Sequence, residues 1–416
     1  MDAANQTLIL VASLVFWLAS FGIVLPYLVY PLMLAVFAAL FGKPGGKPET
    51  GVEPQLPSVT LIISAFNEEK VIAAKLNNVA ALDYPRERLN IVVVSDASSD
   101  ATDAIVLSAA EDDSRIRLHR QDKQDGKTAG LNAVMPSITT ELIVFSDANA
   151  MYARNALLEL VWPFEDARVG YVVGAALYAP AGESGVTNDV DAEATTKAVG
   201  AAHEESVFWN FELWQKAKEA QIDSVVGGDG AIYAIRRQLF WELKADDIND
   251  FVNPLQIVAA GYKGAFNGDA RCFEEAGDSF EKEFRRKRRI VNRSWRAVLR
   301  YVPLISPFKR PLFCLCLAAH KVVRWFGAPL VAIQFLAALA LVWMGAGVIY
   351  DLAVVAIGGS MAAGLVGWAL DKACVNPPRI VSIPYYFYLA IIAAWLGVVD
   401  QARGVRHTTW RHVRSD

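Results

Sequence analysis

The chain has 416 residues, a net charge of −4 and 54% hydrophobic residues. This apolar content is too high for a soluble protein. The apolar residues must therefore be concentrated in particular segments of the sequence. The small net charge gives no indication of nucleic-acid binding, and we expect no nucleic-acid partner.

The first apolar segment lies at the N-terminal end. No charged residue occurs from Thr7 to Phe41, a stretch longer than the roughly 20 residues that a helix needs to cross a bilayer. We predict a transmembrane helix within residues 1–42, with a kink at Pro26 or Pro31. The apolar run is too long, and the Met-Asp start too acidic, for a cleaved signal peptide.

A linker is predicted at residues 43–57, which are rich in Gly and Pro. Positive charges next to a membrane span favour the cytoplasmic side. Lys43 and Lys47 therefore predict that the domain after the linker is cytoplasmic.

Residues 58–301 alternate between strand and helix patterns. Apolar runs predict strands at residues 59–65, 89–95, 115–119, 142–145 and 169–177, with helices between them. Such alternation indicates an α/β fold with a mainly parallel sheet and right-handed crossovers. We predict a Rossmann-like nucleotide-binding domain, although the absence of Gly-x-Gly-x-x-Gly argues against a dinucleotide.

Two of these strands end in an aspartate. The run Leu142–Phe145 leads into Asp147, and Val92–Val94 leads into Asp96. Ligands of α/β sheets bind at the carboxyl ends of strands, so we expect both carboxylates to face one crevice from adjacent strand ends. One would read a base or ribose and the other would hold a divalent cation. The alternative is that Asp147 forms an ordinary Asx turn.

Lys127 follows Gly126 at the start of a predicted helix, where a phosphate could bind. A P-loop needs a further glycine at position 121, which is Gln121. The sequence therefore excludes a P-loop ATPase.

Apolar segments return after the middle domain. Residues 302–325 mix apolar and basic residues, which predicts a helix lying in the membrane interface. Residues 326–400 contain about three spans, and residues 401–416 form a basic tail. One span before the domain and three after it would put the tail outside, whereas its arginines favour the inside. The sequence leaves this orientation open.

Four motifs occur in order along the middle domain: Val59-Thr-Leu-Ile-Ile-Ser-Ala-Phe-Asn-Glu-Glu69, Val94-Ser-Asp-Ala-Ser-Ser-Asp100, Gly126-Lys-Thr-Ala-Gly-Leu-Asn132 and Phe145-Ser-Asp-Ala-Asn-Ala150. Together they resemble the family 2 inverting glycosyltransferases, whose catalytic domain has the GT-A fold. The membrane flanks resemble the branch of cellulose, hyaluronan and poly-N-acetylglucosamine synthases.

The resemblance implies roles for the donor-binding residues. Asp96 would contact the uracil or ribose of a UDP-sugar, and Lys127 and Asn132 would lie along the nucleotide. Asp147 and Asn149 would match the Asp-x-Asp site for Mg²⁺ or Mn²⁺. Asn149 departs from that pattern and leaves one carboxylate for the cation.

The resemblance also implies an acceptor loop and a general base. Gly228, Asp229 and Gly230 match the loop beneath the acceptor, although a tight turn before a strand is the simpler explanation. Asp250 is the first candidate for the base and Asp247 the second. Both residues could instead cap the helix that follows.

A basic segment covers residues 284–295, with a continuous basic run at 285–289 and a further arginine at Arg293. The processive synthases carry Gln-x-x-Arg-Trp here, and the nearest register places Arg286, Arg289 and Ile290 at the three named positions. Arg286 and Arg289 are therefore assigned to the diphosphate and the other basic residues to anionic lipid. The missing Gln and Trp argue against processive synthesis.

The sequence thus predicts a multi-pass inner-membrane glycosyltransferase with a cytoplasmic catalytic domain, building a β-linked glycan such as an exopolysaccharide from a UDP-sugar. Its partners would be the donor, a glycan or lipid-linked acceptor, membrane lipid and other subunits of polysaccharide synthesis. Transfer of a single sugar to a lipid-linked acceptor is the alternative. A catalytically silent sugar-nucleotide-binding scaffold is the third possibility.

Overall fold

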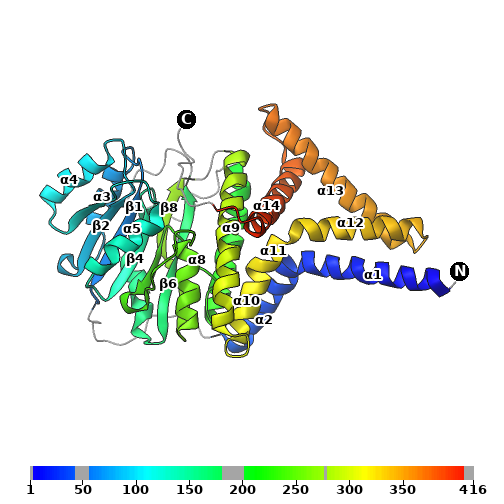
Figure 1. Ribbon diagram of the computed structural model, residues 1–416, viewed down its shortest axis with the longest axis horizontal. Helices are drawn as coiled ribbons and strands as arrows, with labels where there is room; N and C mark the ends of the chain where they lie inside the picture. The colour runs from blue at the N-terminus through cyan, green and yellow to red at the C-terminus, as the bar shows by residue number, and fades with distance from the viewer. Residues whose placement is uncertain (1–2, 43–55, 180–200, 276–278, 407–416) are drawn as a thin grey trace.

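The computed structural model describes residues 3–42, 56–179, 201–275 and 279–406. An α/β domain occupies one end of the molecule, and long apolar helices extend from its side (Figure 1). Most of the predicted linker at 43–57 and residues 407–416 of the predicted basic tail lie outside the described residues.

The domain is built on an eight-stranded mixed sheet with the order β3-β2-β1-β4-β7-β6-β8-β5. Strands β3, β2, β1 and β4 are parallel, β6 is parallel to β8, and β7 and β5 run antiparallel to their neighbours. The strands are β1 (Val59–Ala65), β2 (Leu89–Ser95), β3 (Ile116–Arg120), β4 (Leu142–Asp147), β5 (Met151–Tyr152), β6 (Val169–Ala179), β7 (Tyr233–Arg236) and β8 (Lys263–Glu275).

The order of the strands corrects one expectation. Asp96 and Asp147 follow β2 and β4, which are separated by β1 and are not adjacent. The chain winds outward from β1 to β3 and then returns to the other side of β1. This reversal between β1 and β4 is the kind of switch point at which α/β sheets bind ligands, and Asp147 lies directly at it, opposite Ser64 of β1.

Helices cover both faces of the sheet, which explains the continuous apolar runs. On one face, residues such as Leu61, Ile63 and Val93 pack against α3 (Ile72–Ala80), α4 (Thr102–Asp112) and α6 (Ala156–Val161). On the other face, the alternate residues Ile62 and Phe145 join one core with α5 (Lys127–Val134) and α8 (Asn249–Ala259).

The second core continues into the helices at the two ends of the chain, residues 3–42 and 280–402, which we name the membrane-side helices. It includes Tyr30 and Leu34 near the N-terminal end, Val298 and Tyr301 of α9 (Phe280–Ile305), and Val398 of α14 (Arg379–Ala402). The α/β domain and these helices therefore share buried apolar side chains, and this packing fixes the position of one relative to the other.

The N-terminal apolar segment forms α1 (Ala3–Val24), a π-helical turn (Leu25–Val29) and α2 (Tyr30–Phe41). Pro26 lies within this turn. A proline removes a hydrogen-bond donor from the helix and commonly produces such an irregularity.

The predicted interfacial helix differs from the structure. Helix α9 continues across residue 302, and a separate segment follows, formed by α10 (Pro311–Leu317), a π-helical turn (Ala318–Val322) and α11 (Val323–Trp325). Phe313 and His320 are fully buried. His320 contacts Glu219 of α7 (Ala201–Ile222) at 2.6 Å, so this segment packs against the domain.

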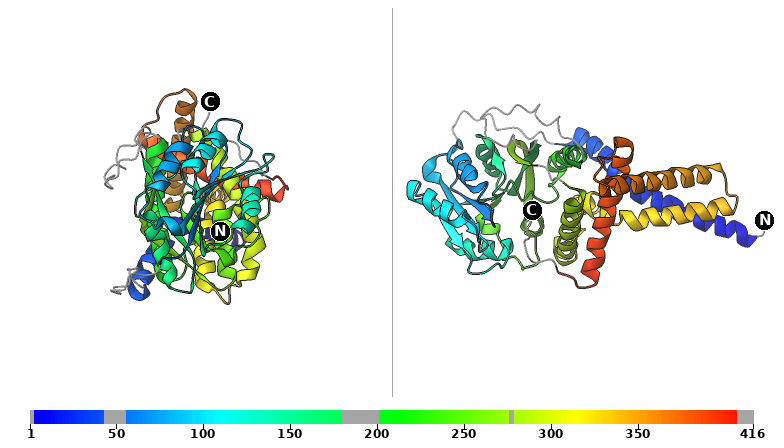
Figure 2. Two further views of the ribbon diagram at one scale, coloured as in Figure 1. Left: turned by 90° about the vertical axis from the view of Figure 1, so that its left-hand side faces the viewer. Right: turned by 90° about the horizontal axis from the view of Figure 1, so that it is seen from above.

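Among the described residues, three helices are long and apolar enough to cross a membrane: Ala4–Phe41, α13 (Val348–Lys372) and α14. The bent pair Pro311–Trp325 and α12 (Gly327–Trp343), with an angle of 67°, would make a fourth. Figure 2 shows α14 running across the direction of α1, α12 and α13.

Helix α14 packs along α9. Phe280 and Tyr385 have ring centroids 4.7 Å apart, and Arg288 contacts Asp400 at 2.6 Å. Beyond the end of α14, the Val405 carbonyl accepts a hydrogen bond from Arg296. These contacts hold α14 against the domain side of the membrane-side helices.

Candidate active site

A cavity of about 460 Å³ lies between the carboxyl end of β4, the start of α8, the inner face of α9 and the membrane-side helices. Four parts of the molecule contribute to its walls. Eight of the residues that line it were proposed from the sequence: Lys127, Asp147, Gly228, Asp229, Gly230, Asp250, Arg286 and Arg289.

Asp147 ends β4, and its neighbour in space is Lys127 of α5. The Nζ atom of Lys127 lies 2.6 Å from Oδ1 of Asp147. Both side chains are partly exposed, at 18% and 29%, so this ion pair is open to a ligand. The pair joins two motifs that are separated by 20 positions in the chain.

Asp250 lies in the first turn of α8, and its carboxylate lies near Gly230, as do Asp147 and Lys127. A Cβ atom on Gly230 would lie 3.3 Å from Oδ2 of Asp250, 3.5 Å from Oδ2 of Asp147 and 3.8 Å from Nζ of Lys127. The three charged groups therefore surround Gly230. A larger residue would occupy the space between them.

The environment of Asp250 suits a general base. Burial raises the pKa of its carboxyl, Lys127 opposes this effect, and the nearby Asp229 and Asp147 raise the pKa further. A base with a raised pKa holds an abstracted proton more readily.

The loop before β7 is held tightly against α8. The Gly228 N–H donates to the Asp250 carbonyl at 2.5 Å, and a Cβ on Gly228 would lie only 2.7 Å from that oxygen. Glycine is thus required by this close approach. The predicted acceptor loop and the predicted base therefore form one packed unit.

Asp229, the middle residue of this loop, is buried next to Lys216 of α7. Its Oδ2 atom lies 3.8 Å from Lys216 Nζ, which donates to the Gly228 carbonyl at 3.4 Å. Lys216 was not predicted, because α7 carries no motif that distinguishes it from other helical lysines.

A basic wall is formed by α9. Arg286, Arg289 and Arg293 line the cavity, and spacings of three and four residues place them on one helical face. Burial lowers the pKa of Arg293 to about 10, and burial together with Arg286 lowers the pKa of Arg289. A crowded, partly desolvated group of cations favours an anionic ligand.

The assignment of the other basic residues to lipid needs correction. Lys287 and Arg293 also line the cavity. Arg293 donates to the Asp247 carbonyl and lies 3.3 Å from Thr128 Oγ1. Arg288 forms its ion pair with Asp400 of α14. The spacing of Arg286, Arg289 and Arg293 predicts that they share one face of a helix. The sequence alone could not show that this face lines the cavity.

Asp96 lies behind the cavity wall. Its Oδ1 atom accepts from Gln121 Nε2 at 2.7 Å and from the Gly126 N–H at 2.9 Å. Its Oδ2 atom is buried and has no hydrogen-bond partner among the described residues. Burial raises the pKa of this carboxyl. Asp96 thus fixes the start of α5 and leaves one oxygen for a further donor.

Asn132 does not reach the cavity. Its amide donates to the Leu243 carbonyl at 2.7 Å, and its oxygen accepts from the Leu243 N–H at 3.0 Å. Both functions of the side chain are used to tie α5 to the segment before α8. The structure therefore gives Asn132 a structural role in place of the predicted nucleotide contact.

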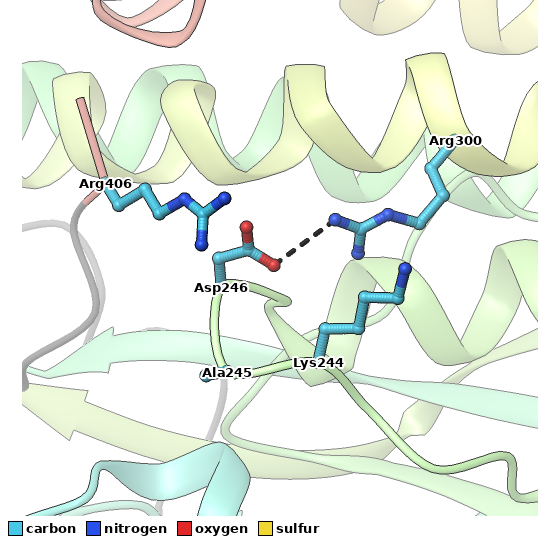
Figure 3. Close-up of a pocket in the computed structure, with 5 residues that line it drawn as sticks. All are labelled: Lys244, Ala245, Asp246, Arg300 and Arg406. Carbon is cyan, nitrogen blue, oxygen red and sulfur yellow. Dashed lines mark hydrogen bonds and ion pairs between the residues drawn. The ribbon is translucent and has the colours of Figure 1, made fainter. Parts of the chain in front are cut away.

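Asp247 is also held away from the cavity. It is 1% exposed and contacts Arg300 at 2.5 Å, while Asp246 contacts Arg296 at 2.7 Å and Arg300 at 3.3 Å. Figure 3 shows Asp246 and Arg300 facing each other at a separate, smaller pocket. Of the two candidate bases, only Asp250 lines the main cavity. Neither aspartate caps α8, whose N-cap residue is Ile248.

Asn149 is not among the residues that line the cavity, but it contacts one that is. Its Nδ2 atom donates to Oε1 of Glu274 at 3.2 Å, and Glu274 at the end of β8 lines the cavity beside Asp147. The sequence analysis missed Glu274 because it did not predict β8. No group of three or more His, Cys, Asp or Glu side chains that could hold a metal occurs in the described part of the chain.

Comparison with known proteins gives the family. Residues 60–244 match the family described as Glycosyl transferase family 2. This chain carries a family 2 glycosyltransferase domain. The matched residues include β1, β2, β4 and the loop at Gly228–Gly230, which confirms the resemblance of the sequence motifs to this family of domains.

Several curated relatives match part of this chain, and two of them are described here. A Beta-monoglucosyldiacylglycerol synthase from Trichormus variabilis is 34% identical over 123 residues, covering 29% of this chain and 26% of the relative. A Poly-beta-1,6-N-acetyl-D-glucosamine synthase from Staphylococcus aureus is 28% identical over 129 residues, covering 31% and 30%. The chain thus spans less than a third of the length of either relative.

A solved structure has a similar fold over nearly the whole chain. The mannosyltransferase PcManGT from Pyrobaculum calidifontis, in complex with GDP-Man and Mn²⁺, superposes with a TM-score of 0.64 and 22% sequence identity, covering 96% of this chain and 99% of that chain. This similarity confirms the predicted GT-A fold with its apolar flanking helices.

Proposed function

We propose that this glycosyltransferase transfers a sugar from a UDP-sugar to an acceptor hydroxyl at the membrane, with inversion, and forms a β-linked glycan. The observation that carries the proposal is the convergence of Asp250, Asp147 and Lys127 around Gly230. This geometry puts a base on one side of a small space and a charged donor-binding pair on the other.

The donor would bind on the side of α5 and α9. Asp96 lies behind the cavity wall, and its Oδ2 atom has no hydrogen-bond partner among the described residues. A hydroxyl or N–H group of the nucleotide that reached this oxygen would satisfy a buried acceptor that is otherwise costly. Lys127, Arg286, Arg289 and Arg293 would neutralise the diphosphate as it departs. The match of the sequence motifs to enzymes that use UDP-sugars supports uridine as the base.

The residues present fit a divalent cation bound together with the donor. Asp147 and Glu274 supply carboxylate oxygens at the cavity, and Asn149 orients Glu274. Mg²⁺ and Mn²⁺ sites of this type use one or two carboxylates plus substrate phosphates. Bound there, the cation would supply charge neutralisation for the diphosphate, and the Mn²⁺ of the structural neighbour is consistent with it.

The acceptor hydroxyl would lie between Gly230 and Asp250. As the new glycosidic bond forms, Asp250 would take the hydroxyl proton, which supplies a general-base contribution of roughly 10²–10⁴-fold in rate. Burial and two neighbouring carboxylates already raise the pKa of Asp250, so it can retain that proton until the product leaves.

The helices support a multi-pass membrane location with the catalytic domain in the cytoplasm. The N-terminal segment would cross once, α12 would cross back and α13 would return. Because α14 runs across these helices and packs on α9, Arg403 would then lie on the side of the catalytic domain. This arrangement agrees with the positive charges there.

A panel of radiolabelled UDP-sugars tests the proposal on the purified full-length protein in lipid nanodiscs. We expect one sugar to give UDP release together with transfer of the label. Absence of UDP release with every UDP-sugar, alongside turnover of a guanosine-linked donor, would contradict the choice of donor. Absence of turnover with any nucleotide sugar would support the scaffold alternative.

A further inference from the structure

Lys75 of α3 is buried in the core of the α/β domain and takes no part in the mechanism proposed above. Its side chain is 0% exposed, and lysine is almost never fully buried unless it is paired. Among the described residues, however, it forms no ion pair with a carboxylate. Burial lowers the pKa of its ammonium group to about 7. So costly a group in the core indicates a role beyond filling space.

The side chain of Lys75 contacts the chain just after the end of β4. Its Nζ atom donates a hydrogen bond to the Ala150 carbonyl and lies 4.0 Å from the ring centroid of Tyr152. The Ala150 N–H in turn donates to the Asp147 carbonyl at 3.3 Å. Ala150 therefore closes a four-residue turn that begins at Asp147, and Lys75 holds the far end of this turn.

This turn carries both residues that the sequence assigned to the cation. Asp147 is its first residue, and Asn149, its third, donates to Glu274 at 3.2 Å. The groups that act electrostatically on Lys75 are Cys272 and Glu274 of β8 and Asp147 of β4. Lys75 is thus within electrostatic range of both carboxylates at the proposed cation site, although it is not among the residues that line the cavity.

We propose that Lys75 is a positioning residue for the divalent cation. By holding the Ala150 carbonyl from inside the core, it fixes the turn and thereby the placement of Asp147 and of the amide that orients Glu274. The inference rests on the proposed function and adds to its cation site a residue that contacts neither the cation nor the donor.

The charge of Lys75 and its hydrogen bond have opposite effects on cation binding, which gives the inference a definite sign. A buried positive charge repels a nearby cation, so loss of the charge alone would strengthen cation binding. Loss of the hydrogen bond to Ala150 would release the turn and weaken it. Groups that orient metal ligands contribute roughly 10–100-fold to metal affinity, and we expect this second effect to dominate.

The test measures Mn²⁺ binding by calorimetry in the presence of UDP, on the full-length protein in nanodiscs and independently of turnover. Lys75→Met keeps an unbranched apolar side chain but removes the hydrogen-bond donor. We expect it to lower Mn²⁺ affinity by roughly tenfold, and excess Mn²⁺ to restore part of the turnover. Leu76→Ala is the control, because Leu76 is buried on the same helix and its apolar side chain cannot form a hydrogen bond to the turn. This control should lower the melting temperature and leave Mn²⁺ affinity unchanged.

A second variant keeps the test decisive if Lys75→Met does not fold. Lys75→Gln retains a shorter hydrogen-bond donor and should weaken Mn²⁺ binding in the same direction by a smaller factor. Unchanged or stronger Mn²⁺ binding in the Lys75 variants, or an equal loss in Leu76→Ala, would overturn the inference while leaving the proposed transferase function intact. A wild-type protein that binds no Mn²⁺ together with UDP would contradict the cation site of the proposed function and this inference with it.

Discussion

The Nζ atom of Lys127 lies 2.6 Å from Oδ1 of Asp147, so the proposed metal-binding carboxylate is paired with a lysine. Binding of a cation and a diphosphate would give each of the two residues a new partner. Lys127 would then interact with phosphate oxygens, and Asp147 with the cation. The ion pair therefore holds the two charged groups together at the end of β4.

Asp147→Asn tests this arrangement. The variant should lose transfer by at least roughly 10²-fold, by analogy with the loss of one electrostatic stabiliser in other enzymes. It should remain folded, since Asp147 is partly exposed. Asp269→Asn is a matched control, because Asp269 is 71% exposed and pairs only with the nearby Arg271 among the described contacts. Activity is measured with added Mg²⁺ or Mn²⁺ and again in excess chelator. Full turnover in either the variant or the chelator would contradict a role for a cation.

Gly230→Ala tests whether the space at the centre of the three charged groups is used. The added methyl group would lie 3.3 Å from Asp250 Oδ2 and 3.5 Å from Asp147 Oδ2, so it would displace an acceptor hydroxyl without entering the core. We expect a large loss of turnover with an unchanged melting temperature. Gly359→Ala in α13 is the control, since a methyl group there meets no atom within 4 Å. A Gly230→Ala enzyme with normal turnover would place the reacting atoms elsewhere.

Asn132→Ala distinguishes the observed role of this residue from the one that the motif implied. Its loss would leave the N–H and C=O of Leu243 without their partners, at a cost of about 1–3 kcal/mol for each buried group left unsatisfied. We expect a lower melting temperature with UDP affinity close to wild type. Asn77→Ala, at an exposed position of α3, should change neither quantity. A selective loss of UDP affinity in Asn132→Ala would restore the nucleotide role.

The sequence was sufficient to predict the parallel half of the sheet and the strand-end aspartates, because Leu142–Asp147 and Leu89–Ser95 are short apolar runs with clear ends. It was insufficient for the antiparallel pairing of β7 and for β8, because pairing with distant strands decides both. The sequence ranked Asp250 ahead of Asp247 only through the resemblance to the family. Only the packing of α9, which brings Arg300 to Asp247, separates them.

The same limitation applies to the membrane side. Helix α14 has the length and composition of a span, but its direction depends on tertiary contacts such as Arg288 with Asp400. Residues 302–325 likewise have an interfacial composition, whereas the buried contact of His320 with Glu219 attaches part of them to the domain. Periodicity and composition do not encode such partners.

The pH dependence of turnover provides a further prediction. Burial raises the pKa of Asp250, and a general base must be ionised to act. As pH falls, turnover should therefore decline at a pH above the value of about 3.9 expected for an ordinary aspartate. The profile of kcat is measured with saturating donor and acceptor. An acidic limb at or below the ordinary aspartate value would argue against a buried carboxylate base.

The most direct test of the mechanism is Asp250→Asn, which keeps the shape of the side chain but cannot accept the proton. Turnover by transfer assay and UDP affinity by titration are measured on one purified sample, with Asp247→Asn prepared in parallel. We expect Asp250→Asn to lower turnover by roughly 10²–10⁴-fold with UDP affinity close to wild type, and Asp247→Asn to act mainly on the melting temperature. Near-normal turnover of Asp250→Asn would contradict its assignment as the base.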